Sequence, residues 1–285
     1  MSEAVLTCRL LVTGHCIASG HHLLAGGPHG RIEIPSMVAL LGHPTRGYLL
    51  WDTGYAPRML DMTKWLPWRV YRWITPLRVS PEQAAVAQLA AMGVEARDVR
   101  RVVLSHFHAD HVSGLRDFPL ADVVASKAAY ADVAGRTGLS ALSRAFLPKL
   151  LPRDFERRAV LLDDFTPGEP GPTCDLFGDG SAMVVSLPGH ARGQIGLLAR
   201  TTRGAVLFAA DSCWMSEGYR TATPPHWITN LFIDDVAAMR ETLGRVHRFW
   251  KADPAVMVIP SHCPEAWGRY GPVFAGEGGP PCASS

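Results

Sequence analysis

The chain has 285 residues, of which 47% are hydrophobic and 19% charged, a balance typical of a folded protein with a substantial core. Its 28 basic and 26 acidic residues give a formal net charge of +2, so overall charge gives no reason to expect binding to nucleic acid. The first residues carry no basic segment leading into an apolar stretch, and no apolar run is long enough to span a bilayer, so we expect a cytoplasmic protein.

The first quarter of the chain alternates short apolar segments with turns rich in Gly, His and Pro, which predicts strands. These strands are expected at residues 6–12, 36–41 and 47–51. The residues from 55 to 77 are then dense in aromatic side chains. Pro81 opens an amphipathic segment that predicts a helix as far as Met92.

The rest of the chain repeats this order from strands to helices. We expect strands at residues 122–126, 174–177, 182–187, 193–200, 205–210 and 256–259, and helices at 127–133, 139–151 and 234–250. A Gly-Asp-Gly turn at residues 178–180 predicts a hairpin. The residues from about 275 are mostly Gly, Pro and Ser and are expected to form a flexible tail. Two halves of this kind predict one α/β domain over residues 1–285, with its two sheets packed together and its helices outside.

The most informative segment is a run of three histidines and one aspartate within six positions, directly after an apolar segment. These residues are His106, His108, Asp110 and His111. Imidazoles held this close repel one another once protonated, whereas a bound cation favours their neutral forms. The alternative interpretation is a solvated His-rich turn. The strand-like segment before the run and the interleaved aspartate favour a metal site instead.

Three further candidate ligands each follow a strand-like segment. His190 comes shortly after residues 182–187, Asp211 directly after 205–210, and His262 shortly after 256–259. Each of them alone is weak evidence, because a single histidine near a Gly or Pro turn is usually structural or exposed. Together with the histidine-rich run, and in this order, they strengthen the prediction of a metal site.

With these elements in order, the sequence resembles the metallo-β-lactamase superfamily from about residue 34 to 262. The resemblance rests on the H-x-H-x-D-H run, the three later residues, and Asp52 in the segment Trp-Asp-Thr-Gly at 51–54. It implies a four-layer αβ/βα sandwich of two mixed β-sheets with outer helices, with the site at one edge between the sheets. It implies two metal ions: one bound by His106, His108 and His190, the other by Asp110, His111 and His262, with Asp211 bridging them. Asp52 would support the site without binding metal.

The chemistry of these residue types agrees with the resemblance. Imidazole nitrogen and carboxylate oxygen suit zinc, and would also suit iron or manganese. Two such ions can share a water and lower its pKa towards about 7, which supplies hydroxide to attack a polarised carbonyl or phosphoryl group. Asp110 is the candidate to orient this nucleophile and pass a proton to the leaving group. We therefore predict a dinuclear metal-dependent hydrolase acting on a small molecule.

Within the superfamily, the sequence is most similar to the N-acyl homoserine lactonase branch, whose activity is quorum quenching. The similarity lies in residues 35–41 and 47–54 and in the long loop after Asp211. It implies a lactone or related ester with an apolar acyl tail. That branch usually has a tyrosine three residues after the bridging aspartate, where this chain has Trp214, and Tyr219 is the candidate to replace it. The alternatives are a thioesterase or phosphodiesterase of the same superfamily, an iron-containing redox member, and a binding module without turnover.

The segment at about 55–80 has three interpretations. As a cap insertion it would cradle the acyl chain, with Trp65, Trp68 and Trp73 in the substrate pocket. As a core element it would pack on the sheet or on a partner subunit. Its basic residues would also allow contact with a membrane surface, which we weigh below the other two. The opposite wall of the pocket would come from Trp214, Met215, His226 and Trp227. The oligomeric state is left open.

Overall fold

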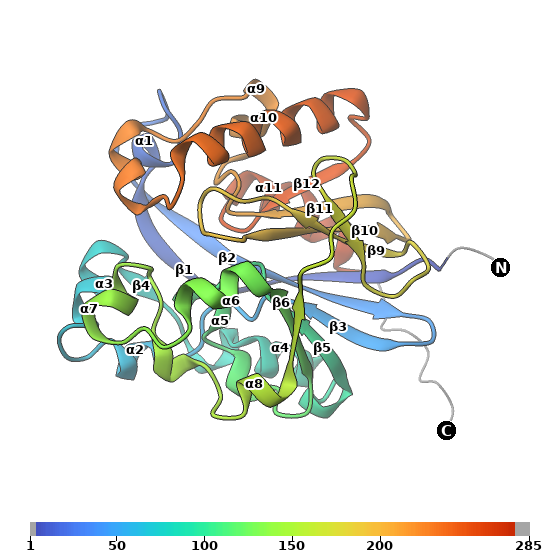
Figure 1. Ribbon diagram of the computed structural model, residues 1–285, viewed down its shortest axis with the longest axis horizontal. Coiled ribbons are helices and arrows are strands. Elements are labelled where there is room, and N and C mark those ends of the chain that lie inside the picture. Colours follow the sequence, from blue (N-terminus) through green and yellow to red (C-terminus); the bar gives the residue numbers. More distant parts are fainter. Residues whose placement is uncertain (1–3, 277–285) are drawn as a thin grey trace.

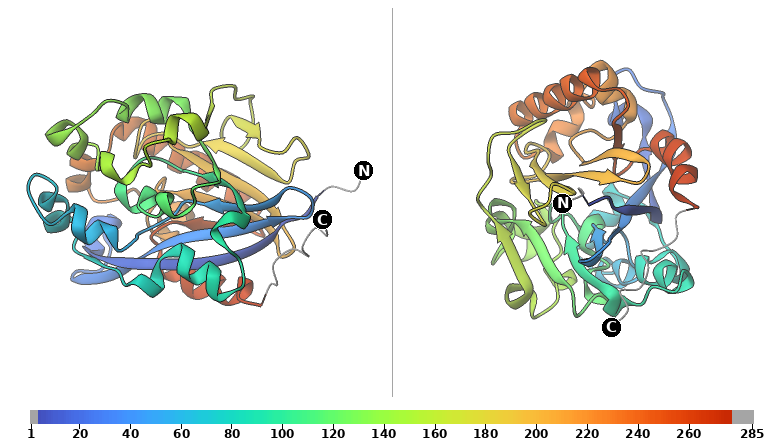
Figure 2. Two further views of the ribbon diagram at one scale, coloured as in Figure 1. Left: turned by 90° about the horizontal axis from the view of Figure 1, so that it is seen from below. Right: turned by 90° about the vertical axis from the view of Figure 1, so that its right-hand side faces the viewer.

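The computed structural model describes residues 4–276 and has two β-sheets that lie between outer layers of helices (Figures 1 and 2). The first sheet has seven strands in the order β4-β1-β2-β3-β5-β6-β7. They are β1 (Thr7–Ser19), β2 (Arg31–His43), β3 (Gly47–Trp51), β4 (Leu77–Arg78), β5 (Val99–Val103), β6 (Asp122–Ser126) and β7 (Ala159–Leu162). Strands β1, β2 and β3 pair antiparallel, whereas β3, β5, β6 and β7 pair parallel, so the sheet is mixed.

The second sheet has five strands in the order β12-β11-β10-β9-β8. They are β8 (Thr173–Asp175), β9 (Ala182–Ser186), β10 (Ile195–Thr201), β11 (Gly204–Ala210) and β12 (Met257–Pro260). Its pairs are antiparallel except β11 with β12, which is parallel. The hairpin predicted around residues 178–180 is confirmed as β8 and β9. Two mixed sheets with outer helices confirm the predicted architecture.

The helices cover the outer faces of the two sheets. They are α1 (Gly20–Leu23), α2 (Arg58–Met62), α3 (Arg69–Ile74), α4 (Ala85–Ala91), α5 (Ala109–Val112), α6 (Lys127–Val133), α7 (Gly138–Leu142), α8 (Phe155–Arg158), α9 (Ser216–Thr221), α10 (Val236–Ala252) and α11 (Pro264–Phe274). Short 3-10 turns are η1 (Pro81–Gln83), η2 (Ala96–Asp98), η3 (Leu115–Asp117), η4 (Pro148–Leu150) and η5 (Trp227–Phe232). The apolar face of α10, with Leu243 and Val246, packs against the outer face of the second sheet.

Two predicted helices are interrupted in the structure. The helix expected from Pro81 to Met92 is a 3-10 turn followed by α4, because Ala84 has extended backbone and the carbonyl of Gln83 accepts from the side chain of Gln88 at 2.7 Å. The region expected to be helical over 139–151 contains only α7 and η4, which are separated by Ala145 in the left-handed conformation. Local side-chain bonds and turns therefore ended helices that the apolar pattern alone predicted as continuous.

A bulge in β1 directs the second half of this strand towards a different layer. Leu10 packs between the two sheets, whereas Cys16 packs with the helices outside the first sheet. Strict alternation would place both even-numbered residues on one face, but the pairing with β2 shifts between Val12 and His15. Gly14 within the bulge has a φ of +136°, and a Cβ there would lie 2.8 Å from the carbonyl oxygen of Arg78. The shift turns the end of β1 towards the cavity described below.

The core between the sheets is formed by apolar side chains from both of them. Trp51 of the first sheet and Phe208 of the second are both buried, with ring centroids 6.1 Å apart. Helix α11, which the sequence did not predict, adds Ala266, Tyr270 and Phe274 to this core. Within residues 4–276, no helix is long and apolar enough to cross a membrane. The tail expected from about 275 lies almost wholly outside the described residues.

Candidate metal centre

The seven ligand candidates come together at one edge between the sheets, although they span more than half of the chain. From the first sheet, His106 and His108 lie in the loop after β5, while Asp110 and His111 lie on α5, which follows directly. From the second sheet, His190, Asp211 and His262 follow the ends of β9, β11 and β12. Each of these side chains lies at the end of a strand or in the loop or short helix that follows it, and together they form three groups able to hold a cation.

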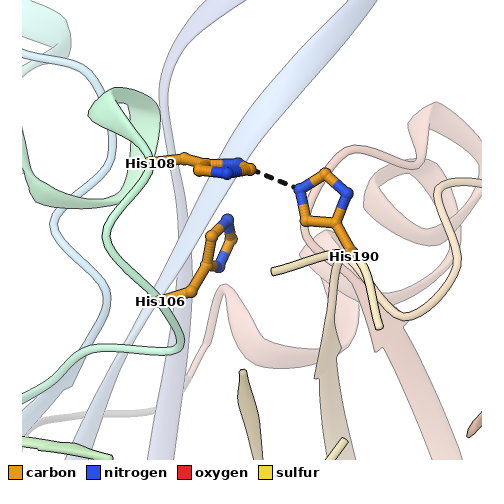
Figure 3. Close-up of side chains that lie close together, drawn as sticks. All are labelled: His106, His108 and His190. Carbon is orange, nitrogen blue, oxygen red and sulfur yellow. Dashed lines mark hydrogen bonds between the residues drawn. The ribbon is translucent and has the colours of Figure 1, made fainter. Parts of the chain in front are cut away.

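The first group contains only imidazoles, from His106, His108 and His190 (Figure 3). One ring nitrogen of each lies within 4.8 Å of the others. Nδ1 of His108 is 3.0 Å from Nε2 of His190, and Nε2 of buried His106 has no hydrogen-bond partner among the described residues. Buried nitrogen atoms are normally paired, so three that face one another fit a shared cation.

The second group adds carboxylates to imidazoles. Oδ2 of Asp110 lies 3.3 Å from Nε2 of His262 and 3.9 Å from Nε2 of His111. Asp211 stands between these two groups and forms the third with His106 and His111. Its Oδ1 is 3.5 Å from Nε2 of His111, and its Oδ2 is 3.4 Å from Nε2 of His190 and 3.5 Å from Nε2 of His262. One carboxylate thus faces both groups, as a bridging ligand would.

Outer contacts fix the orientation of the second group. Asp52 is fully buried and accepts hydrogen bonds of 2.8 Å from the backbone N–H and the hydroxyl of Ser105; its Oδ2 also lies 2.8 Å from Nδ1 of His111. Nδ1 of His262 lies 2.9 Å from the carbonyl oxygen of Pro35. Both rings are therefore held with Nε2 towards the site, the arrangement that orients metal-binding imidazoles.

The turn that carries Asp52 needs unusual backbone. Asp52 has a φ of 54°, in the left-handed region that aspartate tolerates better than most residues. Gly54 has a φ of 61°, and a Cβ there would lie 1.9 Å from Oγ1 of Thr13, so only glycine fits. Ala210, directly before Asp211, has a φ of 49°. Backbone strain at two positions that orient the site suggests that it is kept for function.

The two groups differ in their preferred protonation. Burial, with the neighbouring imidazoles, lowers the pKa of His106 well below its ordinary value and that of His108 to about 3. In the second group burial opposes protonation, but the carboxylates of Asp52, Asp211 and Asp110 outweigh it and raise the pKa of His111 to about 10. The first group therefore presents neutral nitrogen lone pairs, whereas the carboxylates around the second keep the His111 imidazole protonated until a bound cation displaces that proton. This donor set fits divalent cations.

A cavity of about 760 Å³ reaches the candidate ligands from outside. His108, Asp110 and His262 are part of its floor, and most of its remaining wall is apolar, from β1, α3, α7 and η5. Of the residues predicted for the substrate pocket, Trp73 and Trp214 line this cavity.

The other residues predicted for the substrate pocket are not among those that line this cavity. Trp65 and Trp227 are each 69% exposed, and the half-buried Trp68 and Met215 pack against the outer core of the first sheet. His226 packs beside His21 with the two rings tilted, their centroids 4.2 Å apart. The local sequence showed where aromatic residues are dense, but not which faces of two short helices turn inward.

Tyr219, too, is not among the residues that line the cavity. It is buried against Trp250 in the core beneath α10, with ring centroids 5.7 Å apart, and does not reach the cavity. The indole N–H of Trp214 is already used, because it donates to Oδ2 of Asp211 at 3.1 Å.

The tyrosine that does line the cavity is Tyr71 on α3, which the sequence analysis did not single out. It is buried beside Asp110, and burial followed by that carboxylate raises the pKa of the phenol well above its ordinary value. The group therefore stays a hydrogen-bond donor at neutral pH. In the sequence, Tyr71 is one of several aromatic residues between 55 and 77, and nothing there distinguishes it from the others.

Comparison with known proteins gives a consistent result. The family model of the metallo-beta-lactamase superfamily matches residues 32–262. A curated relative, the N-acyl homoserine lactonase AttM of Azorhizobium caulinodans, is 26% identical over 252 residues, which covers 84% of this chain and 85% of the relative. A probable metallo-hydrolase of Mycobacterium tuberculosis is also 26% identical and covers 87% of this chain and 81% of its own.

Solved structures share the fold. An N-acyl homoserine lactone hydrolase with N-hexanoyl-L-homoserine bound at its catalytic metal centre superposes with a TM-score of 0.73 at 17% identity, covering 92% of this chain and 95% of that one. AidC, a dizinc quorum-quenching lactonase, superposes with a TM-score of 0.61 at 15% identity, covering 93% of this chain and 89% of its own. At these identities the likeness establishes the fold.

Proposed function

The chain belongs to the metallo-beta-lactamase superfamily and is a metal-dependent hydrolase, and on this premise we propose that it uses two divalent ions, preferably zinc, to open a lactone or related ester with an apolar acyl tail. The main support is an apolar cavity of about 760 Å³ whose floor includes the candidate ligands. A substrate tail lying along the wall would bring a polar head group to the metal centre. The lactonase relatives make a cyclic ester the first substrate to test.

The ligand assignment follows the groups found in the structure. One ion would be held by His106, His108 and His190, the other by Asp110, His111 and His262, with Asp211 shared between them. When bound, the ions would polarise the ester carbonyl and lower the pKa of an attacking water.

Asp110 is the group that would hold and transfer a proton. Burial alone would raise its pKa, but His111 and His262 outweigh this and keep the pKa below its ordinary value. Asp110 is therefore a carboxylate at neutral pH, able to orient the attacking water, accept its proton and return a proton to the leaving alcohol. Its place in the cavity floor brings it next to the reacting ester.

The substrate class can be tested with substrates that contain three different types of scissile bond. We expect protein loaded with zinc to hydrolyse long-chain N-acyl homoserine lactones faster than acyl thioesters or bis(p-nitrophenyl) phosphate. Metal analysis should give two ions per chain. A preference for the thioester or the phosphodiester would reject a lactone as the substrate, but the protein would still be a metal-dependent hydrolase. Iron with a visible absorption band after aerobic purification would favour the redox alternative.

Replacement of Tyr71 by phenylalanine tests the donor that we propose in place of the missing tyrosine. The phenol lies beside Asp110, where an ester carbonyl would be held, so we expect kcat to fall roughly 100-fold, the scale for losing one donor to a developing oxyanion. Metal content should not change. The matched control is Tyr219→Phe, which changes a buried tyrosine that does not line the cavity and should keep full activity. Unchanged kcat in Tyr71→Phe would remove this role.

Replacement of Trp73 by alanine tests the acyl-binding wall. Trp73 lines the cavity, so its loss should raise KM for ten- and twelve-carbon acyl chains more than for four-carbon chains. Trp68→Ala is the control from the same segment. Trp68 packs on the core, so this change should lower stability and leave the ratio between chain lengths unchanged. Equal effects of Trp73→Ala on all chain lengths would contradict an acyl-binding wall.

A further inference from the structure

Exposed apolar side chains are concentrated around the mouth of the cavity. Eight of them, each 55–80% exposed, form what we call the apolar rim: Trp65, Leu66, Trp73, Ile74, Leu139, Trp227, Leu231 and Phe232. Soluble proteins rarely leave so many large apolar groups together in water, and such patches usually mark an interaction surface.

The apolar rim is assembled from three segments that are distant in sequence. They are the stretch from the end of α2 through α3, the helix α7, and the turn η5. Trp73, Leu139 and Leu231 also line the same cavity, so the three segments surround one opening. Figures 1 and 2 show α3 and α7 at the same end of the molecule. The turn η5 is held next to α1 at that end by a 3.1 Å bond from the N–H of His226 to the carbonyl oxygen of His22.

Positive charge accompanies the tryptophans of the rim. Lys64, Arg69 and Arg72 are exposed, and Asp61 is the only acidic residue between positions 58 and 74. Nζ of Lys64 lies 5.5 Å from the ring centroid of Trp65, and the guanidinium of Arg69 lies 5.8 Å from that of Trp73. Tryptophan favours the boundary between lipid and water, and basic side chains beside it favour anionic head groups.

We propose that the apolar rim binds the surface of an anionic lipid membrane, with the mouth of the cavity facing the acyl chains. The rim would lie at the depth of the head groups, as peripheral apolar surfaces do. An amphipathic substrate dissolved in the membrane would then enter the cavity without crossing water. A second copy of this chain is a poorer occupant, because symmetric pairing through the rim would bring the basic residues of both copies close together.

Vesicle flotation tests this proposal and does not require catalysis. The wild-type protein should float with vesicles of phosphatidylglycerol and phosphatidylcholine and much less with phosphatidylcholine alone. The triple variant Trp65→Ser, Leu66→Ser, Trp227→Ser removes rim residues that do not line the cavity, and it should bind at least about tenfold more weakly. The pair Lys64→Glu and Arg69→Glu should remove the preference for the anionic vesicles.

Two controls make the result decisive. Leu120→Ser removes a leucine that is 68% exposed and precedes β6, at the opposite end of the strands from the site. This variant should bind vesicles like the wild type. Hydrolysis of a short-chain, water-soluble lactone should be unchanged in the triple variant, which shows that it folds. Absence of wild-type binding to anionic vesicles would overturn the proposal. So would a wild-type dimer in sedimentation that the triple variant turns into a monomer, because the rim would then bind a second copy.

Discussion

Replacement of His108 by alanine is expected to abolish metal binding by the all-imidazole group and to leave little hydrolysis. Two ring nitrogens and the shared carboxylate of Asp211 would remain there, and this reduced donor set holds a divalent ion poorly. We expect kcat/KM to fall by more than the roughly 10–100-fold that changes in outer contacts cost at metal sites. Metal content by mass spectrometry and kcat/KM on the preferred ester measure the two effects.

The fold should survive this change. His108 is half-buried and makes no side-chain hydrogen bond that caps α5, so its removal frees no backbone donor of this helix, and the contact that is lost is the one to Nε2 of His190. Circular dichroism and the thermal midpoint without metal should match the wild type. His29→Ala removes an exposed histidine outside the candidate ligands and is the matched control. A variant at His108 that keeps both its metal and its activity would refute the assignment of the first group.

The second large effect is expected at Asp52, which touches no substrate. Its carboxylate faces the backbone N–H and hydroxyl of Ser105 and Nδ1 of His111, all in the protein interior. Asp52→Ala leaves these buried groups without their partner. It also places alanine at a φ of 54°, a left-handed conformation that aspartate tolerates better. We expect the free energy of unfolding to fall by about 3–5 kcal/mol, the scale for breaking a buried charged pair. Urea denaturation of metal-free protein measures it.

Asp52→Asn separates the structural from the metal-related part of this effect. Asparagine tolerates the left-handed backbone and keeps one oxygen to accept a hydrogen bond, so most of the stability should return. His111 would lose the charged partner at its Nδ1, and the affinity for the second metal ion should therefore fall by roughly 10–100-fold. An asparagine variant with wild-type affinity would show that Asp52 acts on stability alone.

The candidate ligands could be predicted from the sequence because each one directly follows a buried strand or lies in the loop or short helix after it. Strand ends that share an edge bring distant residues together, so His106, His190 and His262 needed only the order of strands. The left-handed backbone conformation of Asp52 and Ala210 could not be predicted from the order of the strands. It depends on contacts from other elements, such as the bond from the N–H of Asp52 to the carbonyl oxygen of Val103.

The cavity wall could not be predicted at the level of single residues. More than half of the residues from 55 to 77 are aromatic or aliphatic, so their pattern does not define one inner helical face. The structure shows that Tyr71 is buried beside Asp110, whereas Trp73, two positions later, is 63% exposed at the mouth. Packing of α3 against the first sheet made this choice, and that packing includes the part of β1 redirected by the bulge at Gly14.

The candidate ligands are divided between the two sheets, four from the first and three from the second. Bound ions would therefore clamp the two halves of the molecule together. If each ion binds only the docked halves, a free-ion concentration of about a hundred times the dissociation constant stabilises the fold by about 2.7 kcal/mol per ion. The supply of the bound metal would then set how long each molecule survives proteases, as well as how fast it turns over.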